Sequence, residues 1–123
     1  MKSYSFKHVS TSVDDFEYEV LFSDTKFKNS YPTLNDHYLL LRFSEDDDIE
    51  FEGNFCYLES NDESIVGYHR KMDAKLFSTM LFILPRGAES IEIKFRANQR
   101  QLKSLKSALE GLIHGLGKFE SYI

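Results

Sequence analysis

The sequence predicts a mainly β domain: about seven antiparallel strands in a small barrel or sandwich, followed by one C-terminal amphipathic helix. Three observations support this fold class. Up to residue 97, apolar and polar residues alternate with the period of two that is typical of half-buried strands. Aromatic residues, which suit a pleated and half-buried surface, make up 15% of the 123 residues. After residue 98 the apolar spacing changes to three and four residues, which indicates a helix.

The predicted strands follow one another with turn-forming residues between them. Segment 16–22 alternates aromatic or aliphatic residues with glutamates and is a clear half-buried strand. Segment 37–43 is almost uniformly apolar and is expected at the centre of a sheet. In segment 49–57 the aromatic residues alternate with polar ones as core residues do, and Gly53 indicates a bulge or bend. The seven predicted strands are 4–9, 16–22, 37–43, 49–57, 64–70, 76–84 and 91–96.

The C-terminal segment predicts one helix over residues 99–116, after a β-body over residues 1–97, within a single domain. Asn98 suits the N-cap, while Gly115 and Gly117 suit the C-terminal stop. Apolar residues continue past these glycines, so we expect the tail to fold back onto the body. The helix carries a leucine stripe with alternating spacings of three and four residues: Leu102, Leu105, Leu109, Leu112 and Leu116.

The leucine stripe has two main interpretations. It covers an open end or face of the β-body, or it forms the seam of a homodimer. Gly111 and Gly115 interrupt the repeat that a coiled coil would sustain, so the first interpretation is preferred. A helix lying on a membrane surface is disfavoured, because the polar side of this segment is not strongly basic.

Seven strands followed by one C-terminal helix resemble, in order and size, the pleckstrin-homology-like barrel. The resemblance implies a bent sheet with one open end plugged by the helix. It is a resemblance of element order, and the tryptophan usual in the helix of the eukaryotic family is absent here. A PilZ-like barrel also ends in a helix, but its arginine motif and its DxSxxG motif are missing, so its nucleotide ligand is not inferred. A plain sandwich with an appended helix is the alternative.

The net charge of −5 conceals an uneven distribution along the chain. Residues 1–65 contain 15 acidic and 5 basic residues, whereas residues 66–123 contain 5 acidic and 10 basic ones. The simpler interpretation is that the two halves neutralise each other on folding. The alternative is that they form two faces of opposite potential, which steer charged partners.

An acidic patch is the most conspicuous charged feature, and it consists of Asp46, Asp47, Asp48, Glu50 and Glu52. It suits the docking of a basic partner, although a solvated turn that blocks strand pairing would have the same composition. Calcium binding is disfavoured, because the patch lacks the spacing of an EF-hand loop.

A basic patch is predicted in the last third of the chain, and it consists of Lys94, Arg96, Arg100 and Lys103. Its charge suits the phosphates of nucleic acids or lipid headgroups. The overall acidity disfavours nucleic acid as the partner.

The sequence contains no motif for catalysis, metal coordination or phosphate binding: HExxH, GxGxxG, GxxxxGK[ST], GxSxG and SxxK are all missing. We therefore predict no catalytic residue, metal site or cofactor. An enzyme would require long-range convergence of residues such as Asp36, His37, His69 and Cys56. Cys56, the single cysteine, lies between aromatic residues and is expected to be a small buried apolar residue.

These observations favour a non-enzymatic protein-interaction module with acidic and basic faces, such as an adaptor, an inhibitor or an immunity-type protein. The alternative is a β-barrel domain that binds a small ligand or a lipid headgroup. The single cysteine and the absence of an apolar signal region in residues 1–12 predict a cytoplasmic protein. The longest apolar run covers only residues 80–84, so no membrane span is predicted.

Overall fold

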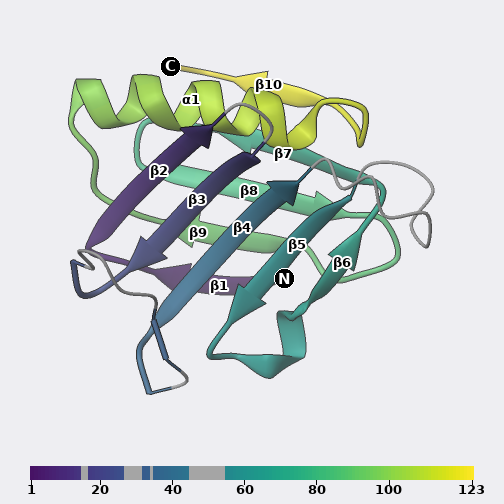
Figure 1. Ribbon diagram of the computed structural model, residues 1–123, viewed down its shortest axis with the longest axis horizontal. Helices are drawn as coiled ribbons and strands as arrows, with labels where there is room; N and C mark the ends of the chain where they lie inside the picture. The colour runs from purple at the N-terminus through teal and green to yellow at the C-terminus, as the bar shows by residue number, and fades with distance from the viewer. Residues whose placement is uncertain (15–16, 27–31, 34, 45–54) are drawn as a thin grey trace.

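The computed structural model describes residues 1–14, 17–26, 32–33, 35–44 and 55–123. This part of the chain forms two five-stranded sheets that lie face to face, with helix α1 (Gln99–Ile113) across one end of both (Figure 1). The front sheet contains β2 (His8–Asp14), β3 (Glu17–Ser23), β4 (Tyr38–Ser44), β5 (Cys56–Ser60) and β6 (Gly67–His69). The rear sheet contains β1 (Lys2–Ser5), β7 (Met72–Leu76), β8 (Met80–Pro85), β9 (Ile91–Lys94) and β10 (Phe119–Ser121).

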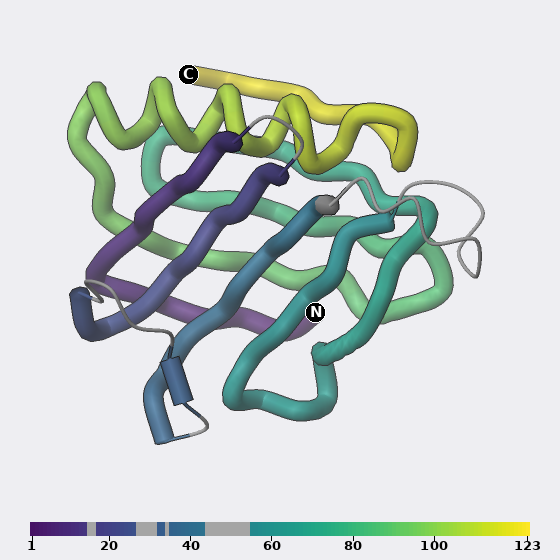
Figure 2. Tube along the Cα trace, in the orientation of Figure 1, coloured from purple at the N-terminus to yellow at the C-terminus, as the bar shows by residue number. Residues whose placement is uncertain are grey.

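The two sheets differ in how the chain builds them. The front sheet is an antiparallel meander in chain order, from β2 at one edge to β6 at the other. A short 3-10 turn, η1 (Glu63–Ile65), lies between β5 and β6. The rear sheet has the order β1-β9-β8-β7-β10, and its edge strands come from the two ends of the chain. Figure 2 shows this path, with the purple N-terminal strand and the yellow C-terminal strand both in the rear layer.

The predicted fold class of a mainly β chain with one C-terminal helix is confirmed. The described residues form ten strands rather than about seven, and neither of their two sheets closes into a barrel. The prediction of an entirely antiparallel arrangement was wrong at both edges of the rear sheet, because β1 pairs parallel with β9 and β10 pairs parallel with β7. The pleckstrin-homology-like order stays a prediction.

Two predicted strands are each divided into two strands by a turn. Segment 4–9 bends at Phe6, whose side chain is buried at the corner where the chain passes from the rear sheet to the front sheet. Segment 76–84 is divided by a hairpin turn, in which the Phe77 N–H donates to the Met80 carbonyl oxygen at 2.8 Å. Burial changes at each turn, because the buried Phe6 and Val9 lie three positions apart and the buried Leu76 and Leu81 lie five apart. The apolar residues of the sequence alone did not reveal this change of strand.

Helix α1 begins as predicted but ends three residues earlier. The Asn98 side chain accepts from the Gln101 N–H at 2.8 Å, and the Gln101 side chain accepts from the Asn98 N–H at 2.9 Å, which completes a capping box. At the other end Gly115 adopts a positive φ of 80°, a conformation that glycine favours and that ends a helix. The tail then returns as β10 beside β7, which confirms that it folds back onto the body.

The core lies between the two sheets and beneath α1. The helix contacts β2, β3 and β4 of the front sheet together with β7 and β10 of the rear sheet. Every residue of the leucine stripe is buried there, with at most 6% exposure. This corrects the interpretation of the stripe as a homodimer seam, because the chain already covers these side chains itself. No helix in the described part of the chain is long and apolar enough to cross a membrane.

Candidate interaction surfaces

The acidic patch predicted from the sequence falls in a part of the chain that the structure does not describe. All five residues of the acidic patch, from Asp46 to Glu52, lie outside the described residues. They belong to the connection between β4 and β5, which starts after Ser44, and Ser44 lies opposite Glu17 in the register of β4 and β3. The described part of the front sheet has an outer side, which faces away from the core and which we call the front face.

The alternation of side chains along the strands shows which residues form the front face. Residues Val20, Leu41 and Leu58 face the core, so their neighbours along β3, β4 and β5 point outward. One row of facing positions across the sheet consists of Ser12, Glu19, Arg42, Tyr57 and Tyr68. This row thus presents one carboxylate, one guanidinium and two phenols side by side.

An acidic hollow of about 450 Å³ lies on the front face, and it is lined by Glu17, Glu19, Pro32, Arg42 and Glu59. The Nε and Nη2 atoms of Arg42 lie 3.3 and 3.2 Å from the Glu19 carboxylate. A single guanidinium therefore stands among three carboxylates, which leaves an excess of negative charge. At the adjacent hairpin end, Asp14 and Glu17 occupy directly facing positions, an arrangement that generally destabilises a sheet.

Glu59 is held by two tyrosines. The hydroxyls of Tyr38 and Tyr57 donate to its carboxylate at 3.2 and 3.4 Å. Burial, followed by the negative charge of Glu59, raises the pKa of Tyr38 to about 12, and the same causes raise the pKa of Tyr57. Both phenols consequently stay protonated at neutral pH and continue to donate to Glu59.

An aromatic cluster adjoins the hollow at the β5–β6 edge. The Tyr68 ring lies 4.8 Å from the Tyr57 ring and 5.2 Å from the Phe55 ring, measured between centroids. Tyr68 is 62% exposed. Exposed tyrosines present a large apolar area together with a polar end, and they are enriched where proteins meet.

The sequence pattern assigned the wrong side of β5 to the core. Cys56 and Leu58 are fully buried, whereas Phe55 and Tyr57 lie on the opposite side with partial exposure. The alternation of Cys56, Leu58 and Ser60 carried the correct signal, because free cysteine is among the most buried residue types. The aromatic cluster was missed for this reason.

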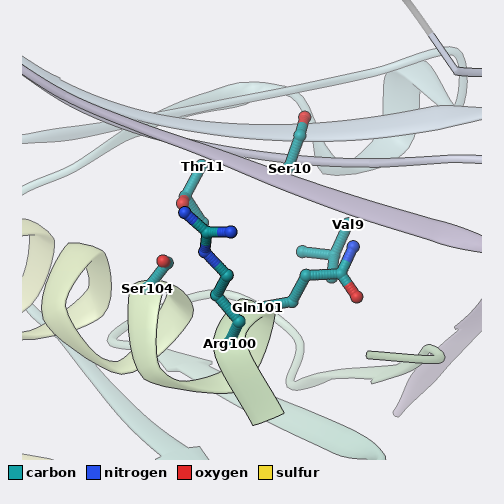
Figure 3. Close-up of a pocket in the computed structure, with 6 residues that line it drawn as sticks. All are labelled: Val9, Ser10, Thr11, Arg100, Gln101 and Ser104. Carbon is teal, nitrogen blue, oxygen red and sulfur yellow. The ribbon is translucent and has the colours of Figure 1, made fainter. Parts of the chain in front are cut away.

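The four residues of the basic patch lie on three successive parts of the chain: β9, the connection that follows it, and α1. Lys94 points outward from the rear sheet, where its Nζ lies 3.6 Å from Glu92, and Arg96 is exposed on the connection to α1. Arg100 and Lys103 are exposed on the first turns of α1. Arg100 lines a groove of about 270 Å³ between α1 and β2, shown in Figure 3, which Lys103 does not line.

The two sheets and the helix differ in the charge that their residues carry. The strands of the front sheet carry four carboxylates and one arginine, whereas the strands of the rear sheet carry three of each sign. Helix α1 carries three basic residues and one acidic residue. The strands of the front sheet therefore carry a net negative charge, the strands of the rear sheet are balanced, and helix α1 carries a net positive charge.

The residues that an enzyme would need do not converge. Cys56 and His69 face each other on β5 and β6, but Asp36 and His37 precede β4, at the end of that strand remote from Cys56. Burial raises the pKa of the Cys56 thiol to about 12 and lowers the pKa of His69, so both stay neutral. A neutral buried thiol is a poor nucleophile. Within the described part, no three metal-ligating residues cluster.

No protein-family model matches this chain, and no curated protein matches it. Its own residues and their geometry therefore carry the functional argument.

Proposed function

We propose that this chain is a non-enzymatic protein-interaction module whose front face binds a basic surface of another protein. The observation that carries the proposal is the acidic hollow beside the exposed aromatic cluster on the front face. Carboxylates would attract and orient the basic partner, and the tyrosines would supply apolar contact area.

Two features of the front face favour binding over a purely structural role. Asp14 and Glu17 face each other although like charges in such positions weaken a sheet. Tyr68 stays largely exposed although it is a large aromatic residue. Departures from local stability rules tend to occur where a protein binds something.

The alternative, a barrel that binds a small ligand, has less support. The space between the two sheets is filled by a continuous core that includes Phe22, Leu58 and Leu105. Ligand pockets usually bury most of the surface of their ligand, whereas the acidic hollow lies on an outer face of a sheet. We therefore retain protein binding as the function that the geometry supports best.

Affinity capture with matched variants tests this proposal. The front-face variant is Glu17→Lys with Tyr68→Ala, and its control is Glu110→Lys with Tyr122→Ala, which makes the same changes at exposed positions away from the front sheet. Each tagged protein is incubated with lysate of its source cells, and bound proteins are quantified by mass spectrometry.

We expect the unaltered chain and the control to retain a stoichiometric protein partner that moderate salt releases. The front-face variant should retain at least about tenfold less of it, because desolvated aromatic and charged contacts dominate such interfaces. Equal retention by all three proteins would contradict the proposal.

A further inference from the structure

We infer that the groove between β2 and α1 binds an extended segment of another protein, which adds to β2 as a further strand and places a carboxylate against Arg100. This site lies apart from the front face and takes a partner of the opposite charge. Three features carry the inference: the character of β2 as an edge, the direction of its free backbone groups, and the charge of the groove.

Strand β2 is an unusually open edge. The other three edge strands of the two sheets, β1, β6 and β10, have three or four residues each, whereas β2 has seven. Its central sequence, from Val9 to Val13, contains only valine, serine and threonine. Natural proteins usually protect an edge with short strands, charges or proline, and the middle of β2 uses none of these.

The backbone register shows which groups of β2 are free. The Asp24 N–H donates to the His37 carbonyl oxygen, so this pair extends the β3–β4 ladder as a hydrogen-bonded pair. Because such pairs alternate along an antiparallel ladder, β3 bonds to β4 through its even-numbered residues and to β2 through its odd-numbered ones.

The register of β2 and β3 then fixes the direction of each group in β2. The odd-numbered residues of β3 face His8, Ser10 and Ser12. The backbone N–H and C=O groups of Val9, Thr11 and Val13 therefore point away from the sheet. In the described part of the chain these groups have no hydrogen-bonding partner.

The groove lies directly along this free edge. Val9, Ser10 and Thr11 line one side, and Arg100, Gln101 and Ser104 of α1 line the other (Figure 3). In strand addition the main chain of a bound segment completes the sheet, and pockets beside it select the side chains. Here the helix provides the second wall.

Arg100 indicates the charge of the bound segment. Its side chain extends from α1 toward β2 in Figure 3, and no carboxylate of the described residues lies within ion-pair distance of it. The dipole of a helix opposes a positive charge in its first turn, so the helix itself gains nothing from arginine at this position. A carboxylate in the bound segment would complete the site with a charge-assisted hydrogen bond. A second copy of this chain paired at β2 would bring another Arg100 instead.

The test uses a phage-displayed library of random octapeptides selected on the full chain, followed by affinity measurements on the enriched peptides. Two variants probe the two halves of the site. Thr11→Pro removes the outward N–H without removing a bond to β3, and proline is tolerated on the free side of an edge strand. Arg100→Glu reverses the charge of the helical wall, and Lys103→Glu is its matched control, one turn along α1 and outside the groove.

We expect the enriched peptides to contain Asp or Glu among β-branched residues. Thr11→Pro and Arg100→Glu should each weaken binding by about tenfold or more. Lys103→Glu and the front-face variant should leave binding within about twofold, because neither touches the groove; this separates the inference from the proposed function. Circular dichroism confirms that each variant is folded.

Enrichment of no peptide, or binding that both Thr11→Pro and Arg100→Glu leave unchanged, would overturn the inference. Sedimentation velocity tests whether a second copy of this chain occupies the edge instead. A dimer of the unaltered chain that Thr11→Pro converts to monomer would assign the edge to a second copy, and it would also overturn the inference.

Discussion

Replacement of Phe22 by alanine should lower the free energy of unfolding by about 3–5 kcal/mol. Phe22 is fully buried in β3, and its ring lies 6.1 Å from the Phe6 ring and 5.5 Å from the Phe95 ring, measured between centroids. These contacts join the front sheet to the corner between β1 and β2 and to the end of the rear sheet. Alanine would leave a cavity at this junction, which a rigid two-layer core cannot close. Urea unfolding followed by circular dichroism measures the loss.

Tyr68→Ala is the control for this prediction. Tyr68 is an aromatic residue of the same sheet, but it is 62% exposed, so its removal should cost less than about 1 kcal/mol. Equal losses for Phe22→Ala and Tyr68→Ala would contradict the two-layer core described above. The same control shows that an effect of Tyr68→Ala on partner binding does not arise from unfolding.

The second large effect is expected for Gly117→Ala, at about 2–3 kcal/mol. Gly117 lies between α1 and β10, where the chain passes closely over β7. An added Cβ would overlap the Met72 carbonyl oxygen and the Asp73 carboxylate. The Asp73 carboxylate also accepts from the Lys118 N–H at 2.7 Å, so it is not free to move aside without losing that bond. The first element to loosen should therefore be β10.

Hydrogen exchange at Tyr122 provides a local measurement of this loosening. The Tyr122 N–H donates to the Leu76 carbonyl oxygen at 2.8 Å, so its exchange should accelerate in Gly117→Ala. Gly67→Ala is the matched control, because the nearest atom to its Cβ would be the His69 Nε2 at 4.0 Å, an ordinary contact. A stability loss for Gly67→Ala as large as that for Gly117→Ala would rule out steric overlap as the cause.

Much of the fold could be predicted from local patterns. Strands β3, β4 and β9 lie within two residues of their predicted positions, because alternation or a uniform apolar run marks them directly. Asn98 and Gly115 marked the two ends of α1, although the helix was predicted to extend to residue 116 and ends at Ile113. These features depend on residues close together in the sequence, and a single sequence reports such features well.

The parts that could not be predicted depend on long-range packing. The sequence alternates Tyr4, Phe6 and His8 with Ser5 and Lys7, and this local pattern does not show that the chain changes sheets at Phe6. The parallel pairing of β1 and β10 joins chain ends to distant strands, and no local pattern encodes such a partner.

The candidate sites were predictable only in part. The charge division along the sequence offered two charged faces only as an alternative, and Arg100 was identified as an anion-binding candidate. The aromatic cluster was hidden by the reversed assignment of β5, and the groove required the register of β2 against β3. Residues such as Glu19 and Arg42 meet only through strand pairing, so spacing alone gave no signal for them.

The rate of association with the captured partner, measured as a function of salt concentration, tests the proposed role of the front face most directly. Attraction between opposite charges accelerates encounter at low salt and is screened as salt rises. We predict a steep fall in rate with salt for the unaltered chain and for Glu110→Lys. Glu17→Lys should slow association at low salt by up to about tenfold and flatten the salt dependence. A rate that is insensitive to salt and unchanged by Glu17→Lys would contradict electrostatic recognition by the front face.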